Sequence, residues 1–443
     1  MSRRAERLVG AVRRLPVPEG TYAIGAGLVV VGLTAYVFQI VAAKRLSDSD
    51  YAALNVLWAI IFVVAPGLFL PLEQEVARAL ASRRALGIGG GPLVRRAAGL
   101  GGALALTVIV ACGAASGLIV DELFNGHSGL LVGLFVAVIS YYVAHIVRGT
   151  LSGNGRFGPY GLMQGAEGVV RLVFCLALAA AAVSAAGWYG LALALPPFFA
   201  VAVSLRGQHG LLLPGPPAPW SELSSALALL LLGSMFAQAL SYASVLGVQI
   251  LAAPDQKELV AGFITGLFIA RIPLLLFQAI QAALLPKLSG FAAEGKHADF
   301  RTGMRRLLLV VGALCVGGTI AASLVGPEVG KLLFPTKWVL DHRDMALLTL
   351  AATSFILALT LAQGLIALKA YGAAATAWVC GIVGFVGTAA AGNDLFLRNE
   401  LGFLVGSGVA AVLMATFLLV TMRRRTASLG DLVEAIEHEP LEL

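Results

Sequence analysis

The residue with the clearest potential for chemistry is Arg271, which lies near the middle of a long apolar stretch, Glu258 to Phe291. A guanidinium at the centre of a bilayer costs about 2.5–3.5 kcal/mol on insertion scales, so it is expected to face a protein interior or a wet cavity. Gln278 and Gln281 follow on the same stretch. We therefore take these three side chains as candidate substrate contacts.

Two interpretations of Arg271 are open. It could be a structural arginine, paired with a backbone carbonyl or with a carboxylate on a neighbouring helix. It could also line a cavity and bind an anionic substrate, because the planar guanidinium fork suits phosphate. The acidic residues well inside apolar spans all lie in the first half of the chain: Glu73, Glu75 and Glu167. The second half thus offers Arg271 no carboxylate of its own, which favours the cavity interpretation.

Glu167 and Arg171 are two further charged residues inside an apolar span. They are four residues apart, with the acidic residue first, which is the favourable order for an ion pair along one helix. Such a pair would neutralise both charges without any function. Alternatively, Glu167 is a titratable coupling site and Arg171 is a second phosphate contact.

The segment PLEQEVAR (71–78) ends the second apolar span with a polar turn. Glu75 and Arg78 are three residues apart and are expected to pair. The segment is either an interfacial polar turn or a gate. Glu73, Glu75 and Arg78 are thus candidate gating or coupling residues beside Glu167.

Composition indicates an all-α polytopic membrane protein. Hydrophobic residues make up 59% of the 443 residues and charged residues only 12%, with a mean hydropathy of +0.89. A soluble globular protein carries about 25% charged residues. The cysteines (Cys112, Cys175, Cys315, Cys380) are far apart inside apolar spans, so they are expected to be small core residues. We find no nucleotide-binding motif, catalytic triad or metal-ligand spacing, and therefore expect no enzyme activity, cofactor or metal.

Apolar stretches of about 20 residues can each cross a bilayer. The sequence predicts twelve: 20–43, 51–77, 97–120, 128–149, 158–184, 187–205, 222–250, 258–286, 306–325, 344–368, 371–391 and 400–422. Lys and Arg residues in the tails and alternate loops number 22 on the side of the termini and 7 on the other. The positive-inside rule therefore places both termini in the cytoplasm, and it explains the net charge of +7 without any nucleic-acid partner.

The chain divides into two halves at a Pro- and Gly-rich stretch. Six predicted spans precede this stretch and six follow it, which indicates a parallel repeat with binding at the interface between the halves. The second and eighth spans look related, since each has a mid-span proline, a polar final turn and a basic exit loop. The predicted divisions are a basic tail (1–19), an N-terminal bundle (20–206), a linker (207–220), a C-terminal bundle (221–422) and a second cytoplasmic tail (423–443).

Three stretches resemble one transporter superfamily. These are SDYAALNVLWAIIFVVAPGLFLPLEQEVARAL, VRGTLSGNGRFGPYGLMQGAEGVVRL and RIPLLLFQAIQAALLPKLSGFAAEGK. They look like the second span, the junction of spans four and five, and the eighth span of the polysaccharide-type flippases. Those proteins belong to the multidrug/oligosaccharidyl-lipid/polysaccharide (MOP) exporter superfamily. The two-times-six layout extends the resemblance over nearly the whole chain.

The resemblance implies a V-shaped pair of six-helix bundles around a central cavity, working by alternating access in a bacterial inner membrane. It also implies basic cavity residues that hold the pyrophosphate and sugar of a polyprenyl-linked saccharide, while the lipid tail stays among membrane lipids. Arg271 and Arg171 are the matching positions. The expected role is flipping or export of such an intermediate for cell-surface polysaccharide or lipopolysaccharide, in contact with polysaccharide-assembly proteins.

Two other functions remain open. The first is cation-coupled multidrug efflux within the same superfamily, for which Glu167 would be the titratable carboxylate. The second is a non-transporting scaffold in polysaccharide assembly, whose Arg271 and Arg171 would be buried against helices without a continuous cavity.

Overall fold

The computed structural model of the chain is all-helical over the residues that it describes, which are 21–223, 227–253, 256–274, 277, 297–335 and 337–438. Within these ranges, eleven helices are long and apolar enough to span a membrane, and a shorter apolar helix covers Leu259–Leu274. These match the twelve predicted spans one by one. The rest of the predicted eighth span, including Gln278 and Gln281, lies outside the described residues.

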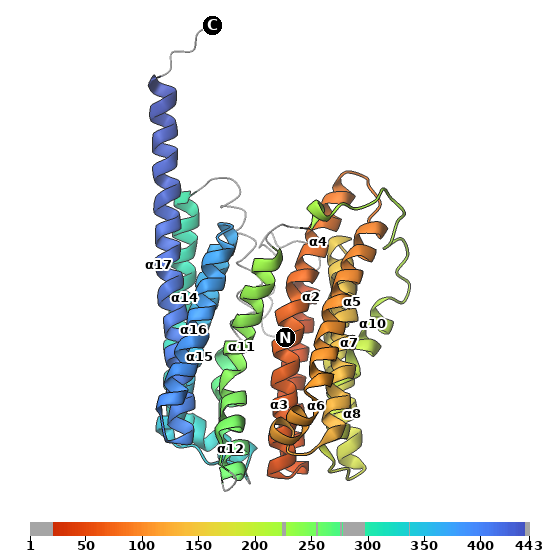
Figure 1. Cartoon of the computed structure of the whole chain (residues 1–443), viewed down its shortest axis with the longest axis vertical. Helices are drawn as coiled ribbons and strands as arrows, with labels where there is room; N and C mark the ends of the chain where they lie inside the picture. The colour runs from red at the N-terminus through yellow and green to blue at the C-terminus, as the bar shows by residue number, and fades with distance from the viewer. Residues whose placement is uncertain are drawn as a thin grey trace, which may run out of the picture.

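The helices form two bundles that lie side by side (Figure 1). The first bundle contains α2 (Thr21–Arg45), α3 (Asp48–Val64), η1 (Ala65–Phe69), α4 (Leu70–Ala85), α5 (Gly91–Ala114), α6 (Ser116–Leu118), η2 (Ile119–Leu123), α7 (Ser128–Gly153), α8 (Phe157–Ala180), α9 (Ala186–Ala194) and α10 (Pro196–Ser204). After the short η3 (Trp220–Glu222), the second bundle contains α11 (Leu227–Leu251), α12 (Lys257–Ala270), α14 (His297–Leu333), α15 (His342–Ala367), α16 (Tyr371–Ala391) and α17 (Leu395–His438).

Packing within each bundle is more extensive than packing between them. In the first bundle α2 packs along α8, and α7 packs against α4 and α9; in the second, α17 packs along α15 and α16. The bundles meet where α3, η1 and α4 contact α11, and where α3 contacts α12. We call the end of the molecule that carries residues 207–220 the linker end, and the opposite end, where α3 begins, the Asp48 end.

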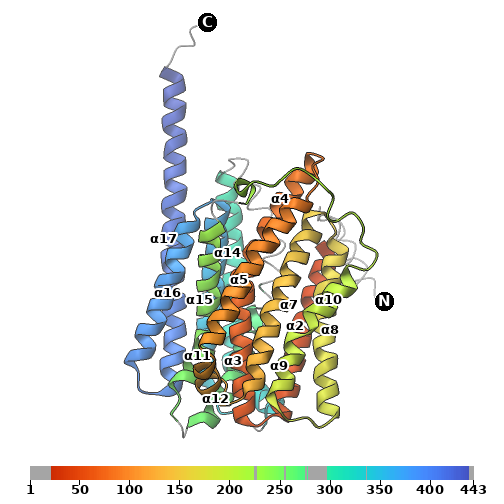
Figure 2. The same cartoon turned by 45° about the vertical axis from the view of Figure 1, so that its right-hand side comes forward.

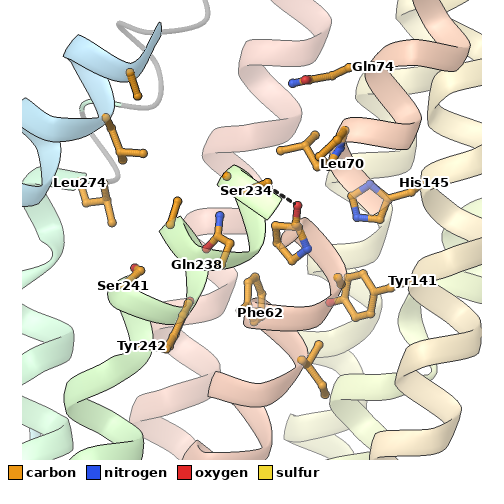
Figure 3. A pocket seen from close by; sticks show the side chains of 18 of the residues that line it. Phe62, Leu70, Gln74, Tyr141, His145, Ser234, Gln238, Ser241, Tyr242 and Leu274 are labelled. Atoms are coloured by element: carbon orange, nitrogen blue, oxygen red, sulfur yellow. Dashed lines mark hydrogen bonds between the residues drawn. The ribbon is translucent and has the colours of Figure 1, made fainter. Parts of the chain in front are cut away.

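Pro66 changes the geometry of the predicted second span. A proline has no backbone N–H to donate within a helix, and the span relaxes into the wider π-helical turn η1. The Pro66 carbonyl accepts a hydrogen bond of 2.9 Å from Ser234 Oγ on α11 (Figure 3). The irregular turn is therefore one of the places where the two bundles touch.

Three boundaries differ from the sequence prediction. Helix α14 begins at His297, so basic residues expected in a loop (Arg301, Arg305 and Arg306) lie on its first turns. The same helix continues through Pro327 to Leu333, which shortens the predicted loop 326–343. Helix α17 continues to His438 and extends beyond the other helices at the linker end (Figure 2), so it includes most of the predicted tail 423–443. Hydropathy predicts which residues lie within the membrane, whereas a helix continues beyond the membrane as far as its backbone hydrogen bonds do.

The predicted linker 207–220 is irregular up to the η3 turn, which begins at Trp220, but it is fixed to the first bundle. Arg83 on α4 uses all five of its N–H groups there: it donates to both carboxylate oxygens of Glu222 and to the carbonyls of Gly89, Pro216 and Pro217. The guanidinium of Arg83 lowers the pKa of the Glu222 carboxyl through the hydrogen bonds that it donates to the two carboxylate oxygens. The connection between the bundles thus belongs structurally to the first one.

Candidate functional site

A cavity of about 690 Å³ lies between the two bundles. Its walls come from α2, α3, α4, α7 and α8 of the first bundle and from α11, α12, α15 and α16 of the second. The lining residues lie on the linker-end half of these helices; on α11, for example, they run from Leu229 to Tyr242. Figure 3 shows side chains from both bundles pointing into this space.

Arg271 lines this cavity at the point where α12 stops. The regular helix ends at Ala270, and Arg271 adopts a turn conformation two residues before Pro273, which cannot donate a helical hydrogen bond. The guanidinium donates to the carbonyl of Ser241 and lies 4.5 Å from the ring centre of Tyr242, both on α11. It is 9% exposed and has no carboxylate partner among the described residues. The two predicted interpretations therefore combine, because Arg271 is held by a carbonyl and also lines a cavity.

Arg171 lines the same cavity from the first bundle. Its Nη2 donates to the carbonyl of Val31 on α2 at 2.9 Å, and its guanidinium lies 5.4 Å from the ring centre of Trp58 on α3. It is 1% exposed, and its buried Nε has no hydrogen-bond partner. Within the part of the chain that the structure describes, Arg171 too lacks a carboxylate partner.

The two arginines are linked by a series of aromatic contacts, which we call the aromatic floor: Trp58, Phe62 and Tyr242. Trp58 stacks on Phe62, with ring centres 5.1 Å apart and an angle of 14° between their planes. Phe62 in turn lies 6.1 Å from Tyr242 of the second bundle. A cation over an aromatic face is attracted by the ring quadrupole. The aromatic floor thus connects Arg171, at its first-bundle end, to Arg271 at its second-bundle end.

The predicted ion pair between Glu167 and Arg171 is not formed. Glu167 pairs instead with Arg148 on α7 and accepts a hydrogen bond of 3.0 Å from Tyr141. Helix α7 continues to Gly153, so Arg148, next to the end of the predicted fourth span (128–149), lies more than one turn inside the helix and is buried. Both Glu167 and Arg148 line the cavity and are buried. Arg148 is the functional candidate that the sequence prediction lacks, and its spacing of three from His145 is the signal for a shared helix face.

The polar segment 71–78 is divided between two surroundings. Glu73 is buried. One of its carboxylate oxygens accepts a hydrogen bond of 2.9 Å from Tyr160 Oη, and the other lies 2.7 Å from His145 Nδ1. Glu73 does not line the cavity, although His145 does. The predicted pair of Glu75 and Arg78 is confirmed at 2.9 Å, and Arg78 also donates to the carbonyl of Glu222. Whether these residues act in gating or coupling stays a prediction.

The bundles are joined on the Asp48 side of the cavity. Lys337 of the second bundle forms an ion pair with Asp48 of the first, and Gln249 Nε2 donates to Asn125 Oδ1 at 2.9 Å. Deeper in, Tyr36 donates to the carbonyl of Phe268 at 3.2 Å. No group of three or more potential metal ligands occurs among the described residues.

Comparison with known proteins reveals distant relatives. No protein-family model matches the chain. The uncharacterized protein Rv3630 of Mycobacterium tuberculosis is 25% identical over 422 residues, covering 88% of this chain and 91% of that protein. The uncharacterized protein Mb3654 of Mycobacterium bovis matches to the same extent.

Similar solved structures share one architecture. A mutant of the Vibrio cholerae MATE transporter VcmN has a TM-score of 0.66 at 14% identity, covering 93% of this chain and 96% of that one. A multidrug resistance MATE family transporter of the MOP superfamily matches in its inward-facing conformation, with a TM-score of 0.65, 15% identity and coverage of 93% and 97%. A structure of a multidrug resistance MATE family transporter of the MOP superfamily in an outward-facing conformation gives a TM-score of 0.67 at 15% identity, covering 92% of this chain and 95% of that one. The chain therefore has the two-bundle fold of the MATE transporters of the MOP superfamily.

Proposed function

We propose that this protein transports an anionic, lipid-linked saccharide across a bacterial cytoplasmic membrane by alternating access between its two bundles. One observation carries the proposal: Arg171 and Arg271 come from opposite bundles, line one cavity and have no carboxylate partner among the described residues. A cationic cavity at membrane depth is costly unless a ligand compensates the charge. A phosphate or pyrophosphate group is the ligand class that guanidinium forks suit.

The charge balance of the cavity supports this substrate class. Its described lining includes Arg148, Arg171 and Arg271 but a single carboxylate, that of Glu167. Because Glu167 is already paired with Arg148, the remaining charge is that of the two other guanidiniums. Such a cavity favours anions and repels the cations that many drugs carry. The presence of the cavity also argues against a purely structural scaffold, which would bury both arginines without any such space.

Flipping in proteoliposomes tests the proposal. The probe is a fluorescently labelled polyprenyl-pyrophosphoryl saccharide, and the measurement is the fraction protected from a membrane-impermeant quencher over time. Charge-assisted hydrogen bonds contribute about 1.5–3 kcal/mol, so Arg171→Ala and Arg271→Ala should each slow flipping by about 10- to 100-fold. Arg95→Ala, which removes an exposed arginine at the linker end, is the matched control and should not change the rate. Wild-type rates in both cavity variants would show that the assigned role is wrong.

Multidrug efflux is the second candidate, favoured by one observation: a buried carboxylate, Glu167, lines the cavity. The multidrug resistance transporters with the same fold add weight to it. Dye efflux driven by a proton or sodium gradient, and lost both in Glu167→Gln and in the more stable double variant Glu167→Gln with Arg148→Met, would favour efflux over flipping. We expect no gradient-dependent efflux, because the Glu167 carboxylate is held by Arg148 and Tyr141.

A further inference from the structure

Four glutamines line the cavity in addition to the charged residues, two from each bundle: Gln74, Gln164, Gln238 and Gln363. They come from four different helices, α4, α8, α11 and α15. None of their amides makes a hydrogen bond to another described residue, and Gln164 is 9% exposed. Gln238 and Gln363 are half-buried, and Gln74 is exposed. Amides that line a cavity without a partner in the protein leave their donors and acceptors available to a polar ligand or to water.

The glutamines lie nearer the linker end than the arginines do. On α8, Gln164 precedes Arg171 by seven residues, which is about 10 Å along the helix axis. On α11, Gln238 precedes Tyr242 by one helical turn, toward the start of the helix at the linker end. Gln74 follows the η1 turn in the same direction, and Figure 3 shows it well separated from Phe62 and Tyr242. The cavity thus has two levels: Arg171, Arg271 and the aromatic floor at the deeper one, and the four amides toward the linker end. The Arg148–Glu167 pair also lines the cavity, and Glu167 lies between Gln164 and Arg171 on α8.

We infer that the four glutamines form a hydroxyl-binding level that recognises the sugar of the substrate, separate from the arginine level that binds its phosphate. This inference rests on the proposed function. Each amide offers two donors and an acceptor without net charge, so it can both donate to and accept from a sugar hydroxyl, whereas an ionised phosphate oxygen can use only the donors. Apolar side chains at the same four positions would lack this match.

The arrangement also assigns the orientation of the substrate. With the phosphate at the aromatic floor, the sugar extends toward the linker end, which the positive-inside rule places in the cytoplasm. Amides from both bundles then contact one headgroup, so each bundle holds part of the same sugar.

Binding of two lipid probes to the purified protein in nanodiscs tests this division. One probe is polyprenyl pyrophosphate, and the other is the same lipid carrying one N-acetylglucosamine residue. The wild-type protein should bind the sugar-bearing lipid more tightly. A neutral hydrogen bond contributes about 0.5–1.5 kcal/mol, so Gln164→Met and Gln238→Met should each weaken binding of the sugar-bearing lipid by about 2- to 10-fold. Neither variant should change binding of the bare lipid.

Two controls separate this inference from the proposed function. Gln39→Met removes a buried glutamine amide that has no partner among the described residues and does not line the cavity, and it should bind both probes as the wild type does. Arg171→Ala should weaken both probes equally. Equal binding of the two lipids by the wild type, or glutamine variants that lose both alike, would overturn the hydroxyl-binding level and leave the proposed function standing. If the wild type binds neither lipid, the proposed function and the inference both fall.

Discussion

Lys337, in the segment between α14 and α15, forms an ion pair with Asp48 at the start of α3, and so connects the two bundles on the side of the cavity away from the linker. The Lys337 side chain is 5% exposed and lies 5.7 Å from the ring centre of Tyr51, whereas the Asp48 side chain is 36% exposed. Under the proposed alternating access, such a contact exists only while this end is closed. The proposal therefore implies that the ion pair stabilises the conformation described here relative to one that opens at the Asp48 end.

Removing this ion pair should shift the population toward the conformation open at the Asp48 end. A partly exposed pair contributes about 1–2 kcal/mol once solvent screening is allowed for, so Lys337→Met should raise the open fraction by about 5- to 30-fold. The measurement is the distance between spin labels placed at the Asp48 ends of the two bundles.

The matched control for Lys337→Met is Lys331→Met. Lys331 pairs with Glu328 one turn away on the same helix, at 3.2 Å, and both side chains are more than half exposed. This variant removes the same charge nearby without touching the bundle interface. The double exchange Asp48→Lys with Lys337→Asp should restore the closed population. A spin-label distance distribution that is identical in the wild type and Lys337→Met would contradict the assignment.

The ring of Tyr242 should matter for anion binding more than its hydroxyl does. Tyr242 supports the Arg271 guanidinium through its face, and a desolvated cation–π contact contributes about 0.5–2 kcal/mol. Tyr242→Leu should therefore weaken binding of polyprenyl pyrophosphate by about 2- to 30-fold, while Tyr242→Phe should stay close to the wild type. Titration of the labelled lipid in nanodiscs measures both. If Tyr242→Phe lost as much affinity as Tyr242→Leu, the hydroxyl rather than the ring would be the group that acts on Arg271.

Sequence reasoning locates the spans well because it reads a property that each segment carries by itself. The predicted 371–391 and the observed α16 are identical, and 128–149 falls within α7. The position of Arg271 is readable for the same reason, since one charge in a long apolar run must be housed by protein. That Arg271 binds substrate stays a prediction.

The partners of buried charged residues cannot be predicted from the sequence in this way. Glu167 and Arg171 satisfy the local rule for an intrahelical pair, yet Glu167 pairs with Arg148 because α7 lies beside α8. Arg171 then binds the Val31 carbonyl on α2, a contact across 140 positions of the chain. Such choices depend on how helices pack, and spacing along one helix carries no information about a second helix.

Glu167→Gln should destabilise the protein substantially. It leaves the buried Arg148 guanidinium without its carboxylate, and breaking a buried pair by removing one partner costs about 3–5 kcal/mol. The free energy of unfolding, measured by denaturant titration of the protein in mixed micelles, should fall accordingly. The double variant Glu167→Gln with Arg148→Met should recover much of the loss, because no uncompensated charge remains. Glu328→Gln breaks the exposed pair with Lys331 and is the control, with an expected loss below about 1 kcal/mol. Equal losses in Glu167→Gln and the double variant would show that the pair does not act as a unit.

The linker should detach from the first bundle when the Glu222 carboxyl is neutralised. Glu222 lies outside the membrane spans, and its pKa is lowered by the hydrogen bond from Arg83. A carboxyl with a lowered pKa in the folded state contributes stability that is complete above the ordinary glutamate range and is lost as the pH falls through the lowered value. The amides of Glu222 and Leu223 donate to the carbonyls of Pro219 and Trp220 at the end of the linker, and their hydrogen exchange reports on its attachment. Corrected for intrinsic rates, this exchange should thus be constant at neutral pH and faster below that range. Glu222→Gln should show the fast exchange already at neutral pH, since its neutral amide cannot form a charged fork with Arg83.

Amides of α16, which lies in the second bundle, serve as the internal reference and should keep their protection. If the linker of Glu222→Gln stayed as protected as that of the wild type, the carbonyls of Gly89, Pro216 and Pro217 would be sufficient to hold Arg83 in place.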